Sequence, residues 1–161
     1  GEILVTPLQL ANQAAFIANR GYYYTPHIVA SLGDSSALNP KFKEKHFVGI
    51  DSKYFDIVVS GMEKVVSSGT ARLAQIDSIS VCGKTGTAQN PHGENHSVFI
   101  AFAPKDNPQI AIAVFIENSG YGGTWAAPIA SLMIEQYLKG YVSEKRKYLE
   151  KRMLEGNLIG K

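Results

Sequence analysis

Hydrophobic residues recur at three- and four-residue steps in three stretches of the chain, and helix start and stop signals bound each stretch. The first stretch opens with the capping-box pattern Thr6-Pro7-Leu8-Gln9, which places a proline in the first turn. In the last stretch, Pro128 follows a predicted cap at Thr124 or Ala127. Glycines stand where each pattern stops. The pattern predicts helices over about residues 6–21, 51–69 and 124–140.

Between the second and third predicted helices the period changes, and two runs become apolar at nearly every position. The tight polar turn at residues 105–108 joins these two runs, so they must be antiparallel neighbours. Continuous hydrophobicity indicates that helices cover both faces of the sheet. The predicted strands are residues 79–88, 97–103 and 109–116. The order of helix, helix, three antiparallel strands and helix predicts an α+β fold.

Two stretches lie outside this framework. Residues 31–50 are polar and rich in turn formers, which is typical of a surface excursion. Residues 141–161 are dense in charge, which is typical of a peripheral helix or a frayed end. We therefore expect a body over residues 1–140 and a charged helix or tail over residues 141–161.

Composition narrows the class of protein. The chain has 161 residues, of which 45% are hydrophobic and 19% are charged, and this excludes disorder for most of its length. A net charge of +2 does not indicate a nucleic-acid binder, and the basic residues between 145 and 152 are interpreted as a solvated helix face. No apolar run reaches the roughly 18–20 residues of a membrane-spanning helix.

The segment Gly83-Lys84-Thr85-Gly86-Thr87 is the sharpest local feature. On a strand, the hydroxyls of Thr85 and Thr87 can donate to a carboxylate, and Lys84 adds positive charge. Glycines such as Gly86 remove side chains that would block a ligand lying along the strand. An extended peptide can also pair with the backbone of such a strand. The pattern suits recognition of an anion, and an ordinary glycine-rich strand with a surface lysine is an equal alternative on these five residues alone.

Three other candidates carry weaker signals. A phosphate-binding loop is excluded because Ser78 stands where that motif needs a glycine, and because Lys84 follows a strand instead of opening a helix. His92 and His96 are four residues apart, but the turn-forming residues between them argue against one helical face, so no metal is expected. Cys82 cannot form an internal disulfide, and a small buried residue is the favoured interpretation.

Seven further motifs accompany the lysine-threonine-glycine segment in a fixed order. Together they resemble the C-terminal half of the transpeptidase domain of class B penicillin-binding proteins, of the penicillin-binding protein 2-like, elongation type. The resemblance covers about residues 1–140. The motifs are Thr6-Pro7-Leu8-Gln9, Gly61-Met62, Gly69-Thr70-Ala71, residues 99–104, Glu117-Asn118, Tyr121-Gly122-Gly123 and Ala126-Ala127-Pro128-Ile129.

The resemblance implies a role for each residue of the segment. In the family, a serine attacks the penultimate D-alanine carbonyl of a peptidoglycan stem peptide, and β-lactams trap the same serine. By resemblance, Lys84 contributes positive potential and hydrogen bonding, Thr85 and Thr87 bind the terminal carboxylate, and Gly86 leaves room for the ligand. The backbone N–H of Thr87 would be the second oxyanion donor. No cofactor is implied.

The family's nucleophile motif is absent from the 161 residues, because no serine has a lysine three positions later. We expect this chain to begin inside the transpeptidase domain and to be inactive alone. Two alternatives remain open at this point. One is a serine β-lactamase or D,D-carboxypeptidase, which shares the lysine-threonine-glycine strand. The other is a non-catalytic binding or scaffolding module that keeps a degenerate site.

The resemblance also implies partners and a location. The parent protein would be anchored in the bacterial inner membrane, with this domain in the periplasm beside a glycan-polymerising protein. Its ligands would be the D-Ala-D-Ala end of a stem peptide and β-lactams. The isolated chain is expected to self-associate, either by pairing of the strand at residues 109–116 or by exchange of the last predicted helix.

Overall fold

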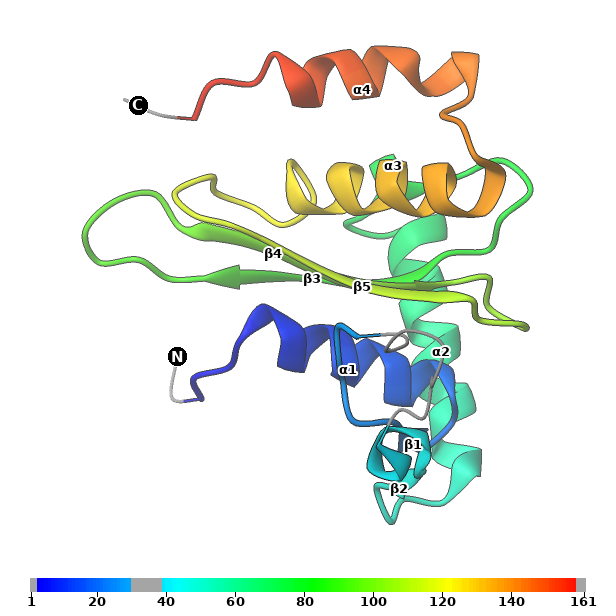
Figure 1. Ribbon diagram of the computed structural model, residues 1–161. Helices are drawn as coiled ribbons and strands as arrows, with labels where there is room; N and C mark the ends of the chain where they lie inside the picture. Colours follow the sequence, from blue (N-terminus) through cyan, green and yellow to red (C-terminus); the bar gives the residue numbers. More distant parts are fainter. Residues whose placement is uncertain (1–2, 30–38, 159–161) are drawn as a thin grey trace.

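The computed structural model describes residues 3–29 and 39–158. Its helices and its three-stranded antiparallel sheet follow the predicted order, which confirms the α+β fold class (Figure 1). The elements are α1 (Pro7–Ala18), β1 (Tyr22–Tyr23), η1 (Pro40–Lys43), β2 (His46–Phe47), α2 (Ser52–Ser67), η2 (Arg72–Ala74), β3 (Cys82–Ala88), β4 (His96–Ala103), β5 (Ile110–Ile116), α3 (Ala126–Lys139), η3 (Glu144–Arg146) and α4 (Lys147–Leu154).

The capping box predicted at the first helix is present. The backbone N–H of Thr6 donates to Gln9 Oε1 at 2.8 Å, and the backbone N–H of Gln9 donates to Thr6 Oγ1 at 3.3 Å. These two bonds satisfy donors that the first turn of a helix otherwise leaves unpaired. Helix α1 therefore begins where the sequence pattern predicts.

The sheet has the order β3-β4-β5, so β3 and β5 are its two edges within the described residues. Thr85 of β3 lies opposite Phe99 of β4, which lies opposite Val114 of β5. Strand β3 begins at Cys82, three residues later than predicted. Ile79, the first residue predicted for this strand, pairs instead with Ile76 across a tight turn in which Ser78 has a φ of 66°.

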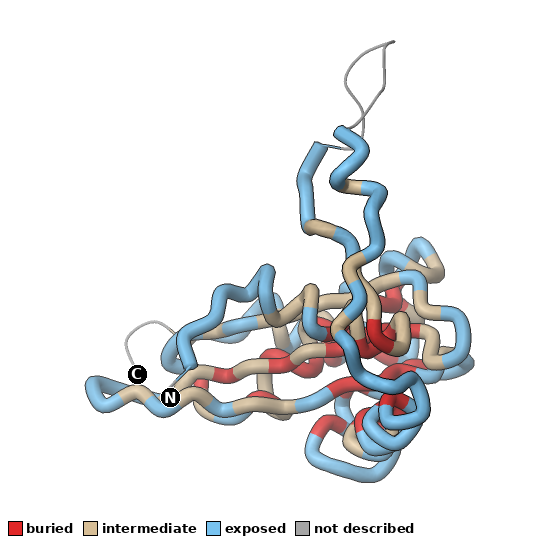
Figure 2. The backbone as a smooth tube through the Cα atoms, turned by 90° about the horizontal axis from the view of Figure 1, so that it is seen from below, coloured by how far each residue is buried: buried red, intermediate tan, exposed pale blue. Residues whose placement is uncertain are grey.

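Two hydrophobic clusters lie on opposite faces of the sheet. Phe99 and Ala101 pack with α3, whereas Phe102 packs with α1 and α2. Successive side chains of a strand point to opposite faces, so β4 contributes to both clusters. Figure 1 shows α3 on one face of the sheet and α1 on the other, and Figure 2, which views these layers from below, shows the buried residues gathered where the layers overlap. Helices cover both faces, as the continuous hydrophobic runs predict.

The start of α3 differs from the prediction. Its N-cap is Trp125, not either residue predicted from the sequence, and no side chain of its own caps it. Ser97 Oγ on β4 accepts from the Ala126 N–H at 3.1 Å, and the Gly122 carbonyl accepts from the Ala127 N–H at 2.9 Å. A neighbouring strand and loop therefore satisfy the first turn, which a local sequence pattern cannot reveal.

The charged tail packs on α3. Gly140 ends α3 in the left-handed conformation, with a φ of 79°, and α4 then runs back along the outer side of α3 (Figure 1). Glu135 of α3 is fully buried, and Arg146 of the tail donates to its Oε2 at 2.7 Å. Burial by itself would raise the pKa of Glu135, but hydrogen bonds from Arg146, Ser143 and Lys139 outweigh it and hold that pKa below its ordinary value.

The surface excursion predicted over residues 31–50 is seen in its described part. Strands β1 and β2 pair with each other, with Tyr22 opposite Phe47. Figure 2 shows this region projecting from the rest of the chain with mostly exposed residues. The predicted residues 31–38 lie outside the described residues.

Candidate functional site

The lysine-threonine-glycine segment lies on β3, an edge strand. Alternation along the strand places Thr85 and Thr87 on the same face as Phe99, the face that α3 covers. Lys84 lies on the other face, is exposed, and donates from Nζ to the Thr85 carbonyl at 2.8 Å. The segment therefore presents two hydroxyls on one face and an ammonium on the other, beside an edge whose outer side is unpaired within the described part of the chain.

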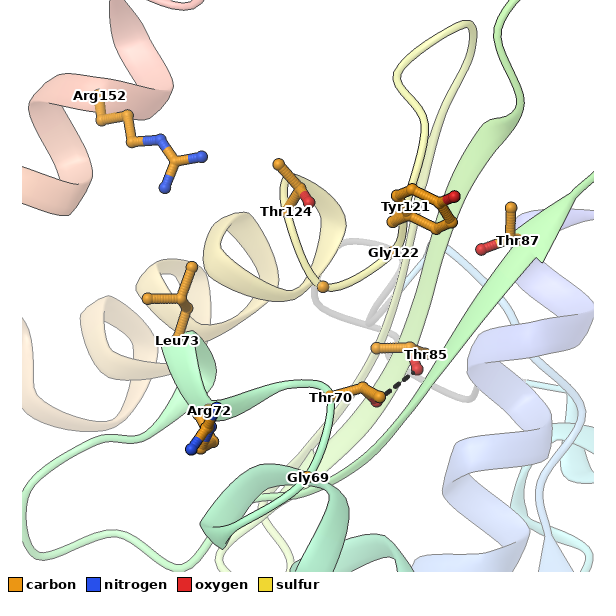
Figure 3. A pocket seen from close by; sticks show the side chains of 11 residues that line it. Gly69, Thr70, Arg72, Leu73, Thr85, Thr87, Tyr121, Gly122, Thr124 and Arg152 are labelled. Carbon is orange, nitrogen blue, oxygen red and sulfur yellow. Dashed lines mark hydrogen bonds between the residues drawn. The ribbon is translucent and has the colours of Figure 1, made fainter.

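A loop after α2 packs against this strand through a hydroxyl pair. Thr70 Oγ1 lies 2.8 Å from Thr85 Oγ1, and one of the two donates to the other (Figure 3). Gly69 precedes it, and a Cβ there would lie 2.8 Å from the Val65 Cα, closer than real Cβ atoms come to a backbone atom. Gly69 therefore lets the chain leave α2 tightly enough to bring Thr70 to β3.

The loop before α3 crosses the same strands at very close range. A Cβ at Gly122 would overlap the Val98 carbonyl oxygen and lie 2.6 Å from the Gly86 carbonyl oxygen. A Cβ at Gly123 would overlap the carbonyl oxygen of Thr70. Two consecutive glycines are thus needed for this loop to pack against β3, β4 and the loop after α2 at once.

These segments enclose a pocket of about 630 Å³, a volume within the range of small-ligand sites. Two guanidinium groups and several hydroxyls line it, and no carboxylate does. Its electrostatic character therefore favours an anionic ligand. The lining residues, most of which Figure 3 labels, are Gly69, Thr70, Arg72, Leu73, Thr85, Thr87, Tyr121, Gly122, Gly123, Thr124 and Arg152.

The structure separates the predicted site residues into two groups. Thr85 and Thr87 line the pocket, whereas Lys84 does not, because it projects from the opposite face of β3. Gly86 is half-buried and its backbone lies against Gly122, but it is the missing side chain of Gly122 that allows this approach. A Cβ at Gly86 would point to the other face of β3, 3.3 Å from the Val98 Cβ.

The weaker candidates occupy ordinary structural positions. His96 Nδ1 accepts from the backbone N–H of Asn118 at 3.1 Å, and its ring packs on Phe115. Within the described ranges, no group of three or more His, Cys, Asp or Glu side chains is arranged to hold a metal ion. Cys82 is fully buried, and burial raises the pKa of its thiol to about 12. That thiol is not an activated nucleophile.

Sequence reasoning missed the two arginines of the pocket. Arg72 lies on the short helix η2, and Arg152 lies on α4, in the tail that the charge pattern assigns to solvent. Nothing local distinguishes Arg152 from its basic neighbours in the sequence. Its position depends on how α4 packs against α3, which is a tertiary property.

Comparison with known proteins identifies this arrangement. Residues 1–135 match the family described as "Penicillin binding protein transpeptidase domain". The chain belongs to this penicillin-binding protein transpeptidase family. The resemblance to class B penicillin-binding proteins inferred from the motifs is thereby confirmed.

Individual relatives agree with this assignment. Peptidoglycan D,D-transpeptidase MrdA of Haemophilus influenzae is 32% identical over 89% of this chain and 25% of its own length. Peptidoglycan D,D-transpeptidase PbpA of Mycobacterium tuberculosis is 34% identical over 86% of this chain and 30% of its own length. The chain thus spans between about a fifth and a third of the length of the curated relatives that it matches.

Solved transpeptidase structures share the fold. The structure of Pseudomonas aeruginosa PBP2 in complex with WCK 5153 superposes with a TM-score of 0.75 at 33% identity, over 90% of this chain and 32% of that one. The imipenem acyl-enzyme complex of penicillin-binding protein A from M. tuberculosis gives a TM-score of 0.71 at 30% identity, over 86% of this chain and 32% of that one. The fold of this chain is therefore part of the penicillin-binding transpeptidase fold.

Proposed function

We propose that this chain forms the carboxylate-binding wall of a peptidoglycan D,D-transpeptidase site. One observation carries the proposal most directly. Thr85 and Thr87 point from an edge strand into a 630 Å³ pocket that contains two guanidinium groups and no carboxylate. An extended peptide can lie along such an edge and place its terminal carboxylate at the hydroxyls. The names of the relatives, peptidoglycan D,D-transpeptidases, support the same substrate class.

In this proposal the four residues of the segment have separate roles. Thr85 and Thr87 donate hydrogen bonds to the terminal carboxylate of a D-Ala-D-Ala peptide. Lys84 adds positive potential from the other side of the strand, and Gly86 leaves room for the ligand along the strand. The backbone N–H of Thr87 stabilises the developing oxyanion, a contact worth about 3–4 kcal/mol in well-studied enzymes.

The nucleophile belongs to a serine-x-x-lysine segment that residues 1–161 do not contain. The serine oxygen bonds to the penultimate D-alanine carbonyl carbon, the bond to the terminal D-alanine nitrogen breaks, and that amine leaves with a proton. The amine of a neighbouring stem then attacks the acyl group and releases the serine. β-Lactams enter by the same attack and remain as the acyl group.

The proposal extends to the setting of the whole protein. No helix in residues 3–29 or 39–158 is both long and apolar enough to cross a bilayer. We infer that a membrane anchor elsewhere in the parent protein holds this domain in the periplasm, where peptidoglycan is cross-linked. There the parent would work beside a glycan-polymerising protein that supplies the strands.

Acylation kinetics test the proposal in a protein that joins this chain to its serine-x-x-lysine segment. Lys84→Ala is expected to slow acylation by a fluorescent penicillin about ten- to a hundred-fold. It removes the positive potential beside the carboxylate site and the charge-assisted hydrogen bond from Nζ to the Thr85 carbonyl, which helps to fix the strand that carries both threonines. Lys53→Ala is the matched control, because Lys53 is an exposed lysine on α2 remote from the pocket lining. Equal acylation rates for Lys84→Ala and the unmodified protein would contradict the proposal. Rapid release of the acyl group would indicate a β-lactamase.

A further inference from the structure

The tail returns to the candidate site. Because α4 runs antiparallel to α3, its last turn lies beside the first turn of α3, where the pocket loop ends (Figure 1). The guanidinium carbon of Arg152 lies 5.7 Å from the ring centroid of Trp125. Gly156 packs so closely on the same ring that a Cβ there would overlap it. The end of the tail is therefore fitted to Trp125, although it lies beyond the residues matched by the family.

Buried contacts hold the tail in this position. Arg146 donates to Glu135 at 2.7 Å and to the Ser131 hydroxyl at 2.5 Å, and Leu149 of α4 is 1% exposed in a cluster with Leu132. A helix fixed by a buried ion pair and a packed leucine presents its remaining side chains in a defined direction. Arg152, three residues after Leu149, is thereby directed at the pocket (Figure 3).

The guanidinium groups of Arg72 and Arg152 are available to a ligand. Among the described residues, neither forms an ion pair with an acidic side chain, whereas the neighbouring Lys151 pairs with Glu155 at 3.8 Å. The first N–H groups of α3 do not compete for an anion, because Ser97 and Gly122 already accept from them. The positive charge of this pocket therefore comes from the two arginines.

We propose that Arg152 binds a second carboxylate on the peptide whose terminal carboxylate binds at Thr85 and Thr87. This inference rests on the proposed function and adds a determinant of substrate choice. Figure 3 shows Arg152 on the side of the pocket away from Thr87, so one carboxylate does not engage both. A peptide with an acidic residue shortly before its D-Ala-D-Ala end places one carboxylate at each group. Guanidinium groups bind carboxylates through paired N–H donors.

The single tryptophan of the chain provides a direct test. Trp125 is half-buried beside Arg152, so its fluorescence reports anions that reach this part of the pocket. Positive charge concentrates iodide locally, and Arg152→Ala is expected to lower iodide quenching roughly two-fold without lowering quenching by neutral acrylamide. Lys151→Ala removes the same charge from the adjacent residue, which does not line the pocket. It should change neither the iodide quenching nor the acrylamide quenching of Trp125. Equal iodide quenching in Arg152→Ala and the unmodified chain would overturn the inference.

Peptide binding, followed by the same fluorescence, tests the ligand class. The probes are acetylated peptides that end in D-Ala-D-Ala and carry either glutamate or glutamine one or two residues earlier. The unmodified chain should bind the glutamate peptide about two- to five-fold more tightly, the scale of one exposed ion pair. Arg152→Ala should abolish this preference, and Arg152→Lys should retain part of it. A preference that survives in Arg152→Ala contradicts the assignment of the second carboxylate to Arg152.

A different set of variants tests the proposed function separately from the role of Arg152. Thr85→Val and Thr87→Val should weaken both peptides equally, because both carry the same terminal carboxylate. If neither threonine variant alters binding, or if neither peptide binds, the assignment of the threonines as a carboxylate site is wrong. The iodide result still decides whether Arg152 forms an anion-binding position.

Discussion

Arg146 donates from Nη1 to the Glu135 carboxylate at 2.7 Å, and this bond joins the charged tail to the helix that covers the sheet. Glu135 is fully buried and Arg146 is 8% exposed. The same guanidinium reaches the Leu73 carbonyl at 3.4 Å, beside the pocket loop after α2. One buried side chain thus connects the tail, α3 and the wall of the candidate site.

Removing Arg146 should detach the tail. Arg146→Ala leaves the buried Glu135 carboxylate without its main partner, and loss of one partner of a buried ion pair costs about 3–5 kcal/mol. We expect hydrogen exchange at the amides of α4 to rise sharply and the free energy of unfolding to fall by a similar amount.

The adjacent residue provides the control. Lys145 pairs with Asp77 at 3.0 Å, but both side chains are mostly exposed, so Lys145→Ala should scarcely change exchange in α4. Comparable exchange in the two variants would mean that the buried ion pair does not hold the tail.

The same ion pair predicts a pH dependence. The pKa of Glu135 is held below its ordinary value of 4.5 in the folded chain, so the folded state favours the carboxylate. Its contribution to stability is therefore fully present above pH 4.5 and is lost as the pH falls through the lowered pKa. Protection of the α4 amides should decline in acid. The Glu135→Gln variant should be less stable than the unmodified chain at neutral pH, and protection of its α4 amides should not decline in acid. If the variant and the unmodified chain lose protection over the same pH range, the transition belongs to other carboxylates.

Much of the fold follows from local patterns. The capping box at Thr6, the apolar runs of the sheet and the stop at Gly140 each depend on nearby residues, and each prediction agrees with the structure. The predicted start of α3 does not agree with the structure, because the hydroxyl of Ser97, on β4, accepts the hydrogen bond from the first turn of that helix. Local chemistry therefore predicts the elements better than it predicts how their ends are satisfied.

The residues of the candidate site also divide into those that a local pattern reveals and those that depend on tertiary packing. Thr85 and Thr87 can be found from sequence, since alternation along one strand places both hydroxyls on one face. Arg72 and Arg152 cannot be found from sequence, because they are 80 positions apart. They line the same pocket only because α4 packs on α3. The charge run of the tail is compatible with a solvated face, whereas the structure buries Arg146 and Leu149 and places Arg152 at the pocket.

Cys82 should be unreactive in the folded chain. Burial raises the pKa of its thiol from 9.0 to about 12, so the thiolate is scarcely populated at pH 8. A colorimetric disulfide reagent should detect no thiol until denaturant is added. Ser60→Cys places a thiol at an exposed position of α2 and should react at once, which controls for the reagent. The contribution of Cys82 to stability is constant below pH 9 and lost as the pH rises toward 12. Rapid reaction of the unmodified chain would show that this site opens readily.

The chain alone should not be acylated by penicillin. None of its serines is followed three residues later by lysine, so no serine carries the activating base that the family uses. Incubation with a fluorescent penicillin, followed by denaturing electrophoresis, should leave the protein unlabelled. A covalent label mapped to one of its serines by mass spectrometry would refute this prediction.

The outer edge of β5 should drive self-association. Within the described residues β5 pairs only with β4, and neither the excursion around β1 and β2 nor the tail extends the sheet beyond it. The strand Ile110–Ile116 carries no charge and no proline, so its free backbone groups form a template for another chain. Sedimentation at several concentrations should therefore show dimers or larger species.

A lysine on this strand should weaken the association. Phe115 is the exposed residue of β5, and Phe115→Lys adds the kind of charge that natural edge strands use against pairing. Because Phe115 is already 37% exposed, the substitution should lower the association constant without unfolding the chain. Tyr137→Lys makes a comparable change at an exposed aromatic residue on α3 and should leave association intact. If Phe115→Lys associates as strongly as Tyr137→Lys, the contact does not involve the β5 edge. Association weakened only by Tyr137→Lys would instead place it on the surface of α3.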